Sequence, residues 1–228
     1  MTAPAAQKFS QLAAIDWDDT GSIRRGAAPI FTAVTTDPSL LSGLLDALDG
    51  DSHLRSMCER YDFLDKLVLY DDPPSGARIR LHLYRPGFFD RPHNHRWSFA
   101  SLILRGSYLH RIYGRDDTFG EDTDPEGLRP IHERVEEPGD RYALHHSSVH
   151  TVQADADTIS LLLRGPAAKD RFLILDRDRG PFWVHGAAQE SAATRATKQM
   201  SAHQIADTIG RVRSLLAGGG PGEAAEGR

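Results

Sequence analysis

The segment 87–106, GFFDRPHNHRWSFASLILRG, decides the fold of this chain. His93 and His95 are separated by one residue where the chain enters a strand, so their side chains project from the same face. That geometry suits two neighbouring positions on one metal ion. Gly106 follows at the start of the next strand, where a tight turn requires a residue without a side chain.

A second segment, residues 139–150 (GDRYALHHSSVH), supplies a third candidate ligand. Gly139 begins the pattern G-x5-H-x-S-x2-H, which ends at His150. His145 or His146 would replace His150 if the register of this strand slipped. The chain has 11 histidines and 1 cysteine, Cys58, so a site with several cysteine ligands and an internal disulfide are both excluded.

Together the two segments resemble the two motifs of the cupin superfamily, G-x5-H-x-H-x3/4-E-x6-G and G-x5-P-x-G-x2-H-x3-N. The first motif is matched by Gly87, His93, His95 and Gly106, and the second by Gly139 and His150. The resemblance covers about residues 63–185. It implies a jelly-roll barrel in which the two motifs lie on neighbouring strands, which would bring His150 beside His93 and His95.

The sequence departs from the cupin motifs at several positions. Phe99, followed by Ala100, stands where the first motif has its glutamate ligand, and neither can bind a metal. In the second motif His145 and Ser147 replace Pro and Gly, and Ala154 replaces the terminal Asn. The remaining three-histidine set resembles that of cysteine dioxygenase and the other thiol dioxygenases.

This resemblance implies Fe(2+) as the cofactor, with O2 and a small molecule that chelates the metal as reactants. Neutral imidazoles also suit other ions, so Zn, Ni, Mn or Cu stay open. Without a carboxylate ligand the ion keeps its full 2+ charge, and we expect an anionic or zwitterionic substrate.

We predict a mainly β fold: a single cupin (double-stranded β-helix, jelly-roll) barrel with N-terminal helices and a C-terminal helix. The expected division is 1–62 for a lead-in and helices that pack on the barrel, 63–186 for the barrel, and 187–228 for a helix and a disordered tail. Short segments separated by turn residues predict the strands. These are Phe63–Tyr70, Ala77–Arg85, Trp97–Arg105, Ser107–Gly114, Leu128–Glu136, Arg141–His145, Val149–Ala154, Thr158–Arg164, Arg171–Leu175 and Phe182–His185.

The helices are predicted from caps and from apolar spacing. Asp37-Pro38 begins one helix, Gly50 ends it, and a second short helix would run from residue 51 or 52 to Tyr61. Ser201–Leu216 has the pattern of an amphipathic helix. Residues 1–30 show no clear period and are expected to be irregular.

Side-chain parity suggests the lining of a pocket. In Ala77–Arg85, one face carries Arg78, Arg80, His82 and Tyr84, and the resemblance to thiol dioxygenases turns this face toward the metal. We predict His82 and Tyr84 as catalytic residues. Lys66, Arg80 and Arg164 are predicted to bind substrate: Lys66 falls near that family's carboxylate-binding arginine, and Arg164 near its pocket tyrosine.

The other candidates receive simpler interpretations. Trp97 and Phe99 are expected in the core or the cavity wall, and His110 and His132 on a strand surface. The acidic run from Asp116 to Glu126 is expected to be a solvated loop.

Composition narrows the class of partner. A net charge of −5 gives no basic surface for nucleic acid, and no apolar run approaches the about 20 residues that cross a membrane. The N-terminus lacks the pattern of a secretory signal, so we expect a cytoplasmic protein. A homodimer is a further expectation.

Three functions remain open from the sequence. The first is an Fe(II)-dependent oxygenase of the thiol-dioxygenase type. The second is a metal-dependent isomerase, lyase or hydrolase that uses no O2, and the third is a small-molecule-binding protein without catalysis.

Overall fold

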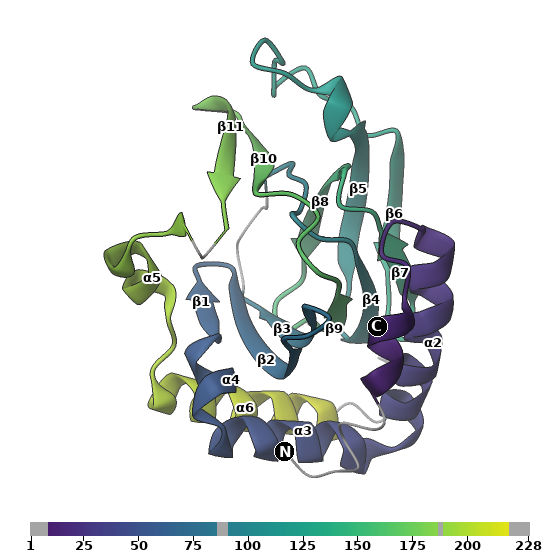
Figure 1. Cartoon of the computed structure of the whole chain (residues 1–228), viewed down its shortest axis with the longest axis vertical. Helices are drawn as coiled ribbons and strands as arrows, with labels where there is room; N and C mark the ends of the chain where they lie inside the picture. The colour runs from purple at the N-terminus through teal and green to yellow at the C-terminus, as the bar shows by residue number, and fades with distance from the viewer. Residues whose placement is uncertain (1–8, 86–90, 187–188, 219–228) are drawn as a thin grey trace, which may run out of the picture.

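The structure is a computed structural model that describes residues 9–85, 91–186 and 189–218, and within them the chain is mainly β (Figure 1). The strands are β1 (Glu59–Tyr61), β2 (Leu64–Asp72), β3 (Ala77–Tyr84), β4 (Phe99–Arg105), β5 (Tyr108–Arg115), β6 (His132–Glu136), β7 (Arg141–Leu144), β8 (Ser148–Ala154), β9 (Ile159–Arg164), β10 (Arg171–Asp176) and β11 (Gly180–His185). Every strand pair is antiparallel.

The strands form two layers. One layer is a six-stranded sheet in the order β1-β2-β3-β9-β4-β7. The other contains the sheet β6-β5-β8 and the hairpin β10-β11, and His93 connects these two parts by bridging to His150 in β8 and to Ile174 in β10. The pairing of strands far apart in sequence, such as β3 with β9, gives the crossovers of a jelly-roll barrel. The predicted fold class is confirmed.

Helices cover the outer face of the six-stranded sheet. They are the 3-10 helix η1 (Ser10–Ala14), α2 (Thr20–Thr36), α3 (Pro38–Gly50), α4 (Ser52–Ser56) and α6 (Ala202–Ala217). Helix α5 (Ala192–Lys198) lies beside β1, where Arg195 and Lys198 line the cavity, and a short 3-10 turn, η2 (Asp116–Thr118), follows β5. In Figure 1, α3 and α6 run side by side below the barrel, and α2 lies along β4 and β7.

The two faces of the six-stranded sheet differ in chemistry, as parity predicts. Ile79, Leu81 and Leu83 face the helices and join the main hydrophobic core. The alternate positions of β3, including Arg80 and His82, line a cavity on the inner face. The main core therefore lies between sheet and helices, and the interior of the barrel holds polar groups beside smaller apolar clusters.

The prediction that residues 1–30 are irregular is wrong within the described part of that range, where η1 covers Ser10–Ala14 and α2 begins at Thr20. Asp19 caps α2 by accepting hydrogen bonds from Gly21 N and Ser22 N, and the helix buries Ile23 and Phe31, among others. The apolar spacing of this helix is interrupted by Pro29, which lies inside it. Packing on the barrel stabilises a helix that this proline disfavours.

Some of the other predicted element boundaries agree with the structure and some do not. The predicted helices that begin after Asp37 and Ser201 are confirmed, the latter with a capping box between Ser201 and Gln204. The helix predicted to reach Tyr61 ends at Ser56, because residues 59–61 pair with β2 as a strand. Helix α5 was not predicted, and β6 begins at His132 instead of Leu128.

Gly106 occupies the predicted turn with φ +72°, and a Cβ there would lie 2.4 Å from Thr158 Oγ1. The matched Gly87 and most of the predicted disordered tail lie outside the described residues. Among the helices that the structure describes, none is long and apolar enough to span a membrane.

Candidate metal centre

The two histidine segments are joined directly through the backbone. His93 N donates to His150 O at 2.9 Å, and His150 N donates to His93 O at 2.8 Å. The chain at His93, ahead of β4, therefore lies against β8. This pairing fixes the relative position of the two imidazoles before any ligand is present.

The three imidazoles converge on one point. His93, His95 and His150 each offer one nitrogen, and these atoms lie within 4.8 Å of one another. The Nε2 atoms of His95 and His150 are 2.9 Å apart. Two nitrogens about 2.1 Å from one ion and at right angles to each other would be about 3 Å apart, so this spacing fits neighbouring ligands. The donor set thus suits a divalent metal.

Two of the three candidate ligands, His93 and His150, are oriented by contacts of their Nδ1 atoms, on the side of the ring away from Nε2. His93 Nδ1 donates to the Arg91 carbonyl oxygen at 2.7 Å, which leaves the Nε2 lone pair for a metal. His150 Nδ1 lies 3.0 Å from His110 Nε2. Burial, followed by repulsion from His93, lowers the pKa of both His95 and His150 well below the usual range. Both rings are therefore neutral, which is the form that binds metals.

His110 belongs to a buried chain of polar groups, so its predicted position on the strand surface is wrong. The ring is 3% exposed, and its Nδ1 lies 3.0 Å from Glu136 Oε1. Arg134 donates to both oxygens of Glu136 at 2.6 and 2.7 Å. Burial raises the pKa of Glu136, but the bonds from His110 and Arg134 outweigh it and lower that pKa. Glu136 is thus an anion that orients His110 against His150.

The sequence alone did not indicate this role, because the role depends on which strand pairs with β5. Tyr108, His110 and Ile112 alternate along β5, and Ile112 pairs with His150. Parity therefore places His110 on the same face as His150. His132, by contrast, is exposed on β6 as predicted.

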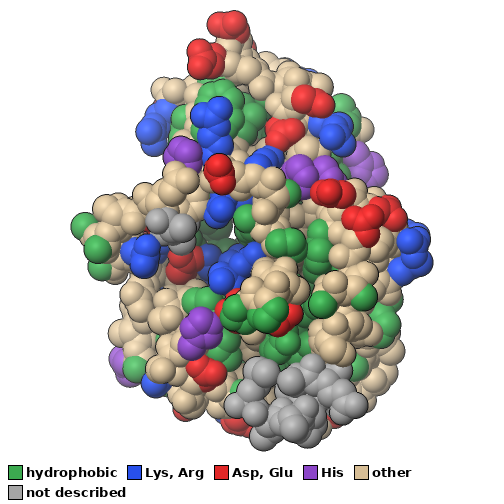
Figure 2. All heavy atoms as spheres, viewed as in Figure 1, with side chains coloured by type: hydrophobic (Ala, Val, Ile, Leu, Met, Phe, Trp, Pro, Cys, Tyr) green, Lys and Arg blue, Asp and Glu red, His purple; other side chains and the backbone are tan. Residues whose placement is uncertain are grey.

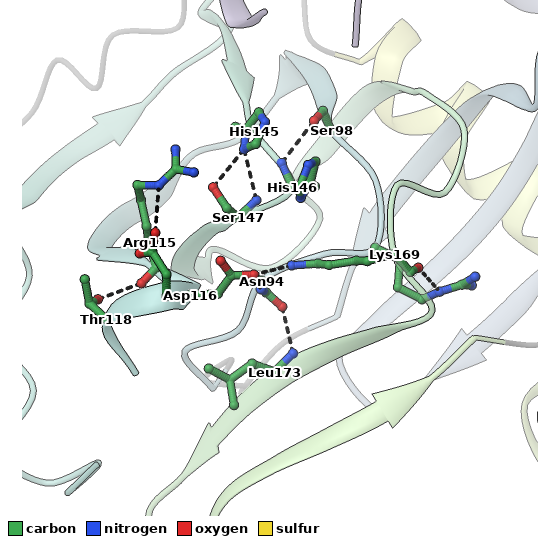
Figure 3. A network of polar contacts seen from close by, with 12 residues as sticks. Asn94, Ser98, Arg115, Asp116, Thr118, His145, His146, Ser147, Lys169 and Leu173 are labelled. Atoms are coloured by element: carbon green, nitrogen blue, oxygen red, sulfur yellow. Dashed lines mark hydrogen bonds and ion pairs between the residues drawn. The ribbon is translucent and has the colours of Figure 1, made fainter. Parts of the chain in front are cut away.

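Asn94, between the two ligands of the first segment, points toward Asp116 and Leu173 and anchors the segment (Figure 3). Its Oδ1 accepts from Leu173 N at 2.7 Å, and its Nδ2 donates to Asp116 Oδ2 at 2.6 Å. Lys169 pairs with the same carboxylate. Asp116 was expected in a solvated loop, but it connects η2 to the ligand segment.

Aromatic rings occupy the place of the missing glutamate ligand. Phe99 is buried and lies edge-on to His95, with ring centroids 5.2 Å apart. Trp97 stacks on His95 at 4.6 Å with an interplanar angle of 19°. Both line the cavity, as expected, so the metal site has an apolar wall where a carboxylate would otherwise lie.

The site opens into a cavity of about 840 Å³ inside the barrel. Figure 2 shows a hollow in this face of the molecule, with Lys and Arg side chains within it. All eight residues predicted for the site line this cavity: His93, His95, His150, His82, Tyr84, Lys66, Arg80 and Arg164. The structure brings them together, although their roles beyond position remain predictions.

The cationic side chains of the cavity differ in their partners. Lys66 pairs with Glu59, Arg78 with Asp71, and Lys198 with Glu59 and Glu190. Burial and repulsion from Arg80 hold the pKa of Lys66 well below its usual range. Among the described residues no carboxylate pairs with Arg80 or Arg164, and neither lies on the barrel exterior.

His145 and His146 do not replace His150. They form a separate group with Asp18, whose Oδ1 lies 3.9 Å from His145 Nε2 and 3.6 Å from His146 Nε2. Figure 3 shows the two rings beside Ser147 and Ser98, and His146 N donates to Ser98 Oγ. The register of β8 places His150 at the site instead.

No protein-family model matches the chain, and no curated protein matches it significantly. Among solved structures it is similar to KdgF from Halomonas sp., with 17% identity and a TM-score of 0.36 over 47% of this chain and 86% of that one. It is also similar to an RmlC-like cupin from Shewanella frigidimarina, with 17% identity and a TM-score of 0.37 over 50% of this chain and 86% of that one. The L-ribose isomerase of Cellulomonas parahominis has 14% identity to this chain and a TM-score of 0.38. The match covers 46% of this chain and 61% of that enzyme.

These distant likenesses say nothing about substrate or reaction. The assignment of the barrel comes from the strand order of this chain, and the function has to be argued from its own side chains.

Proposed function

We propose that this protein is a mononuclear non-haem Fe(II)-dependent oxygenase, similar to the thiol dioxygenases, that acts on a small anionic or zwitterionic metabolite. One observation carries the proposal: three imidazoles face one point on the wall of a cavity that also holds Arg80 and Arg164, with which no carboxylate of the described residues pairs. A neutral ligand set leaves the ion's charge uncompensated, which favours an anionic chelating substrate.

A ferrous ion held on three sides supplies open positions for substrate and O2. His93, His95 and His150 would hold it, with Arg91 O and His110 orienting two of the rings. Phe99 and Trp97 exclude water from the side where a carboxylate ligand would lie. A dry wall strengthens the electrostatic attraction between the metal site and an anion.

His82 and Tyr84 are the proposed catalytic residues. Burial, followed by repulsion from Arg80 and Lys66, lowers the pKa of His82 to about 3. The ring is therefore neutral, and its Nε2 has no hydrogen-bond partner among the described residues. We expect His82 to hold a substrate atom by a hydrogen bond, and Tyr84, whose ring lies 6.3 Å from that of His82, to hold or move a proton nearby.

Lys66, Arg80 and Arg164 are the proposed substrate-binding residues. Lys66 is balanced by Glu59 and contributes less net charge than the two arginines. The cytoplasmic location, the homodimer, the absence of nucleic-acid and membrane partners, and the boundaries at 62 and 186 stay predictions.

The test is anaerobic reconstitution with Fe(II), followed by oxygen uptake with a panel of thiols and amino acids. We expect one iron per chain, a change in its spectrum on addition of a chelating substrate, and oxygen consumption that requires both. A protein that retains iron but consumes no oxygen with any chelator in the panel would contradict the oxygenase assignment.

A second candidate is a metal-dependent isomerase or lyase that uses Zn, Ni or Mn as a Lewis acid. Tyr84 favours it, since it lines the cavity as a group able to exchange a proton, and the neutral His82 beside it would position the substrate. Substrate turnover under nitrogen with one of these ions would support this reaction class over the oxygenase. Binding that survives removal of the metal, without turnover, would instead indicate a non-enzymatic binding protein.

A further inference from the structure

Three buried nitrogens in the cavity have no hydrogen-bond partner among the described residues. They are Arg80 Nε, His82 Nε2 and Arg164 Nε. The three side chains belong to residues that are 9%, 8% and 7% exposed, and all three line the cavity. Buried polar groups are normally hydrogen-bonded, so an unpaired set at one place indicates a missing partner.

The strand register places these groups on one surface. In the pairing of β3 with β9, Arg78 lies opposite Arg164, Arg80 opposite Leu162, and His82 opposite Ser160. Arg80 and Arg164 are thus diagonal neighbours on the inner face of the sheet, and His82 follows along the same row. Two rigid neighbouring strands hold the group.

Within residues 9–85, 91–186 and 189–218, no carboxylate forms an ion pair with either arginine of this group, although the charge of Asp71 acts on both. Burial and repulsion from neighbouring arginines lower the pKa of Arg80 to about 10 and that of Arg164 to about 8. Both side chains remain cations at neutral pH, where a buried charge without a counter-ion lowers stability. Arg78, on the same face, has its own counter-ion in Asp71.

The group is close to the metal centre. The guanidinium carbons of Arg80 and Arg164 lie 5.1 and 5.8 Å from the centroid of the Trp97 ring. The same indole stacks on the ligand His95. A single aromatic ring therefore connects the cationic group to the metal site, and one small molecule can reach both.

We propose that Arg80, His82 and Arg164 form a subsite for a second acidic group of the substrate, so that the substrate is a small dianion held at both ends. This inference rests on the proposed function, because the first acidic group is the one that would bind the metal. The second group is an oxyanion: a carboxylate, a sulfonate or a phosphate. Guanidinium groups bind such oxygens through paired N–H donors.

The subsite can be tested without the metal. Chelator-treated protein is titrated with succinate, sulfate and inorganic phosphate in a calorimeter, with acetate as a monoanion. We expect saturable binding of at least one of the first three, and the preferred anion identifies the acidic group. In Arg80→Met this binding should weaken about tenfold to a hundredfold, the loss expected for a hydrogen bond between charged groups.

Arg78→Met is the matched control, because it removes a cation from the same face of β3 that Asp71 already balances. We expect a much smaller effect there. Arg164 also donates to the carbonyls of Gly76 and Gly165, so Arg164→Met is compared only after its unfolding curve shows a folded protein. Arg80→Lys keeps the positive charge but loses the paired N–H donors of the guanidinium group. We expect this variant to bind the anion with intermediate affinity.

Absence of saturable binding, or binding that Arg80→Met and Arg164→Met leave unchanged, would overturn the subsite. Metal loading is measured in parallel on the same preparations. Anion binding that depends on Arg80 in a protein that takes up no metal would refute the oxygenase while the subsite stands. Normal iron loading without anion binding would refute the subsite alone.

Discussion

His93 and His150 exchange two backbone hydrogen bonds, although they come from different segments of the chain. The pair therefore behaves as one short rung of sheet, and the imidazoles on it are held at a ring-centroid distance of 4.9 Å. Because the backbone of this rung does not depend on the side chains, the ligands can be changed without removing the hydrogen bonds that position them.

Loss of one ligand should abolish stable metal binding while the fold is kept. We expect His93→Ala to take up far less than one divalent ion per chain in elemental analysis, and to give a circular dichroism spectrum like that of the parent. His132→Ala, which changes an exposed histidine on β6, is the control. Equal metal content in the two variants would place the site elsewhere.

The carboxylate of Glu136, which reaches the ligand His150 through His110, should raise the affinity for the metal. Glu136→Gln removes the anion that orients His110 against His150, and we expect metal affinity to fall about tenfold to a hundredfold. Competition with a chromogenic chelator measures the change. The neighbouring Glu133→Gln alters an exposed carboxylate paired with Arg111 and should have no effect. If both variants bind metal as the parent does, the chain from Glu136 to His150 has no role in binding.

Asn94 should matter for stability as well as for the site. Replacing it by Ala leaves the Leu173 N–H without its partner and removes one of the two donors to Asp116 Oδ2, the other donor being Lys169. We expect a loss of about 1–3 kcal/mol in the free energy of unfolding, measured by urea denaturation of metal-free protein. Gln153→Ala, at an exposed position of β8, supplies the comparison. A change no larger than in that control would show that the anchor is dispensable.

The buried neutral His82 should make metal-free protein sensitive to acid. Its pKa falls from 6.5 to about 3 on folding, so between these values the unfolded chain binds the extra proton. Stability contributed by the neutral ring is complete above pH 6.5 and is lost as the pH falls, at about 1.4 kcal/mol per pH unit for one group.

The measurement compares the free energy of unfolding at pH 7.5 and 5.5 in the parent and in His82→Gln. We expect a smaller decrease in the variant, by about 1 kcal/mol. His132→Gln should decrease as the parent does. An identical pH dependence in all three proteins would mean that His82 takes up a proton in the folded state.

The turn at Gly106 should not tolerate a side chain. Gly106→Ala adds a Cβ 2.4 Å from Thr158 Oγ1 at φ +72°, and we expect a loss of more than about 1 kcal/mol in stability. Gly43→Ala, in α3 with no atom within 4 Å of the added Cβ, should be stabilising by about 0.5–1 kcal/mol. Thermal unfolding of the two variants should therefore shift in opposite directions, and a shared direction would contradict this account.

The sequence by itself determined the strand-rich barrel, the helices after Asp37 and Ser201, and the three candidate ligands. The strands, the helices and two of the ligands follow from local information: the period of two in β3, a capping residue before an apolar stripe, and two histidines at i and i+2. The jelly-roll barrel and the third ligand, His150, came from the resemblance to the cupin motifs. The same parity placed Arg80 and His82 on one face of the strand, and the resemblance to the thiol dioxygenases turned that face toward the cavity.

Only the tertiary structure decided which groups meet. Helix α2 is stable through its packing on β4 and β7, which a segment containing Pro29 does not reveal. His110 becomes a partner of His150 because β5 pairs with β8, and Arg80 and Arg164 become neighbours because β3 pairs with β9. Strand pairing between distant segments is set by the burial of whole faces of a sheet, so the partners of a polar side chain in the barrel are fixed by the assembled fold and not by its own neighbours in sequence.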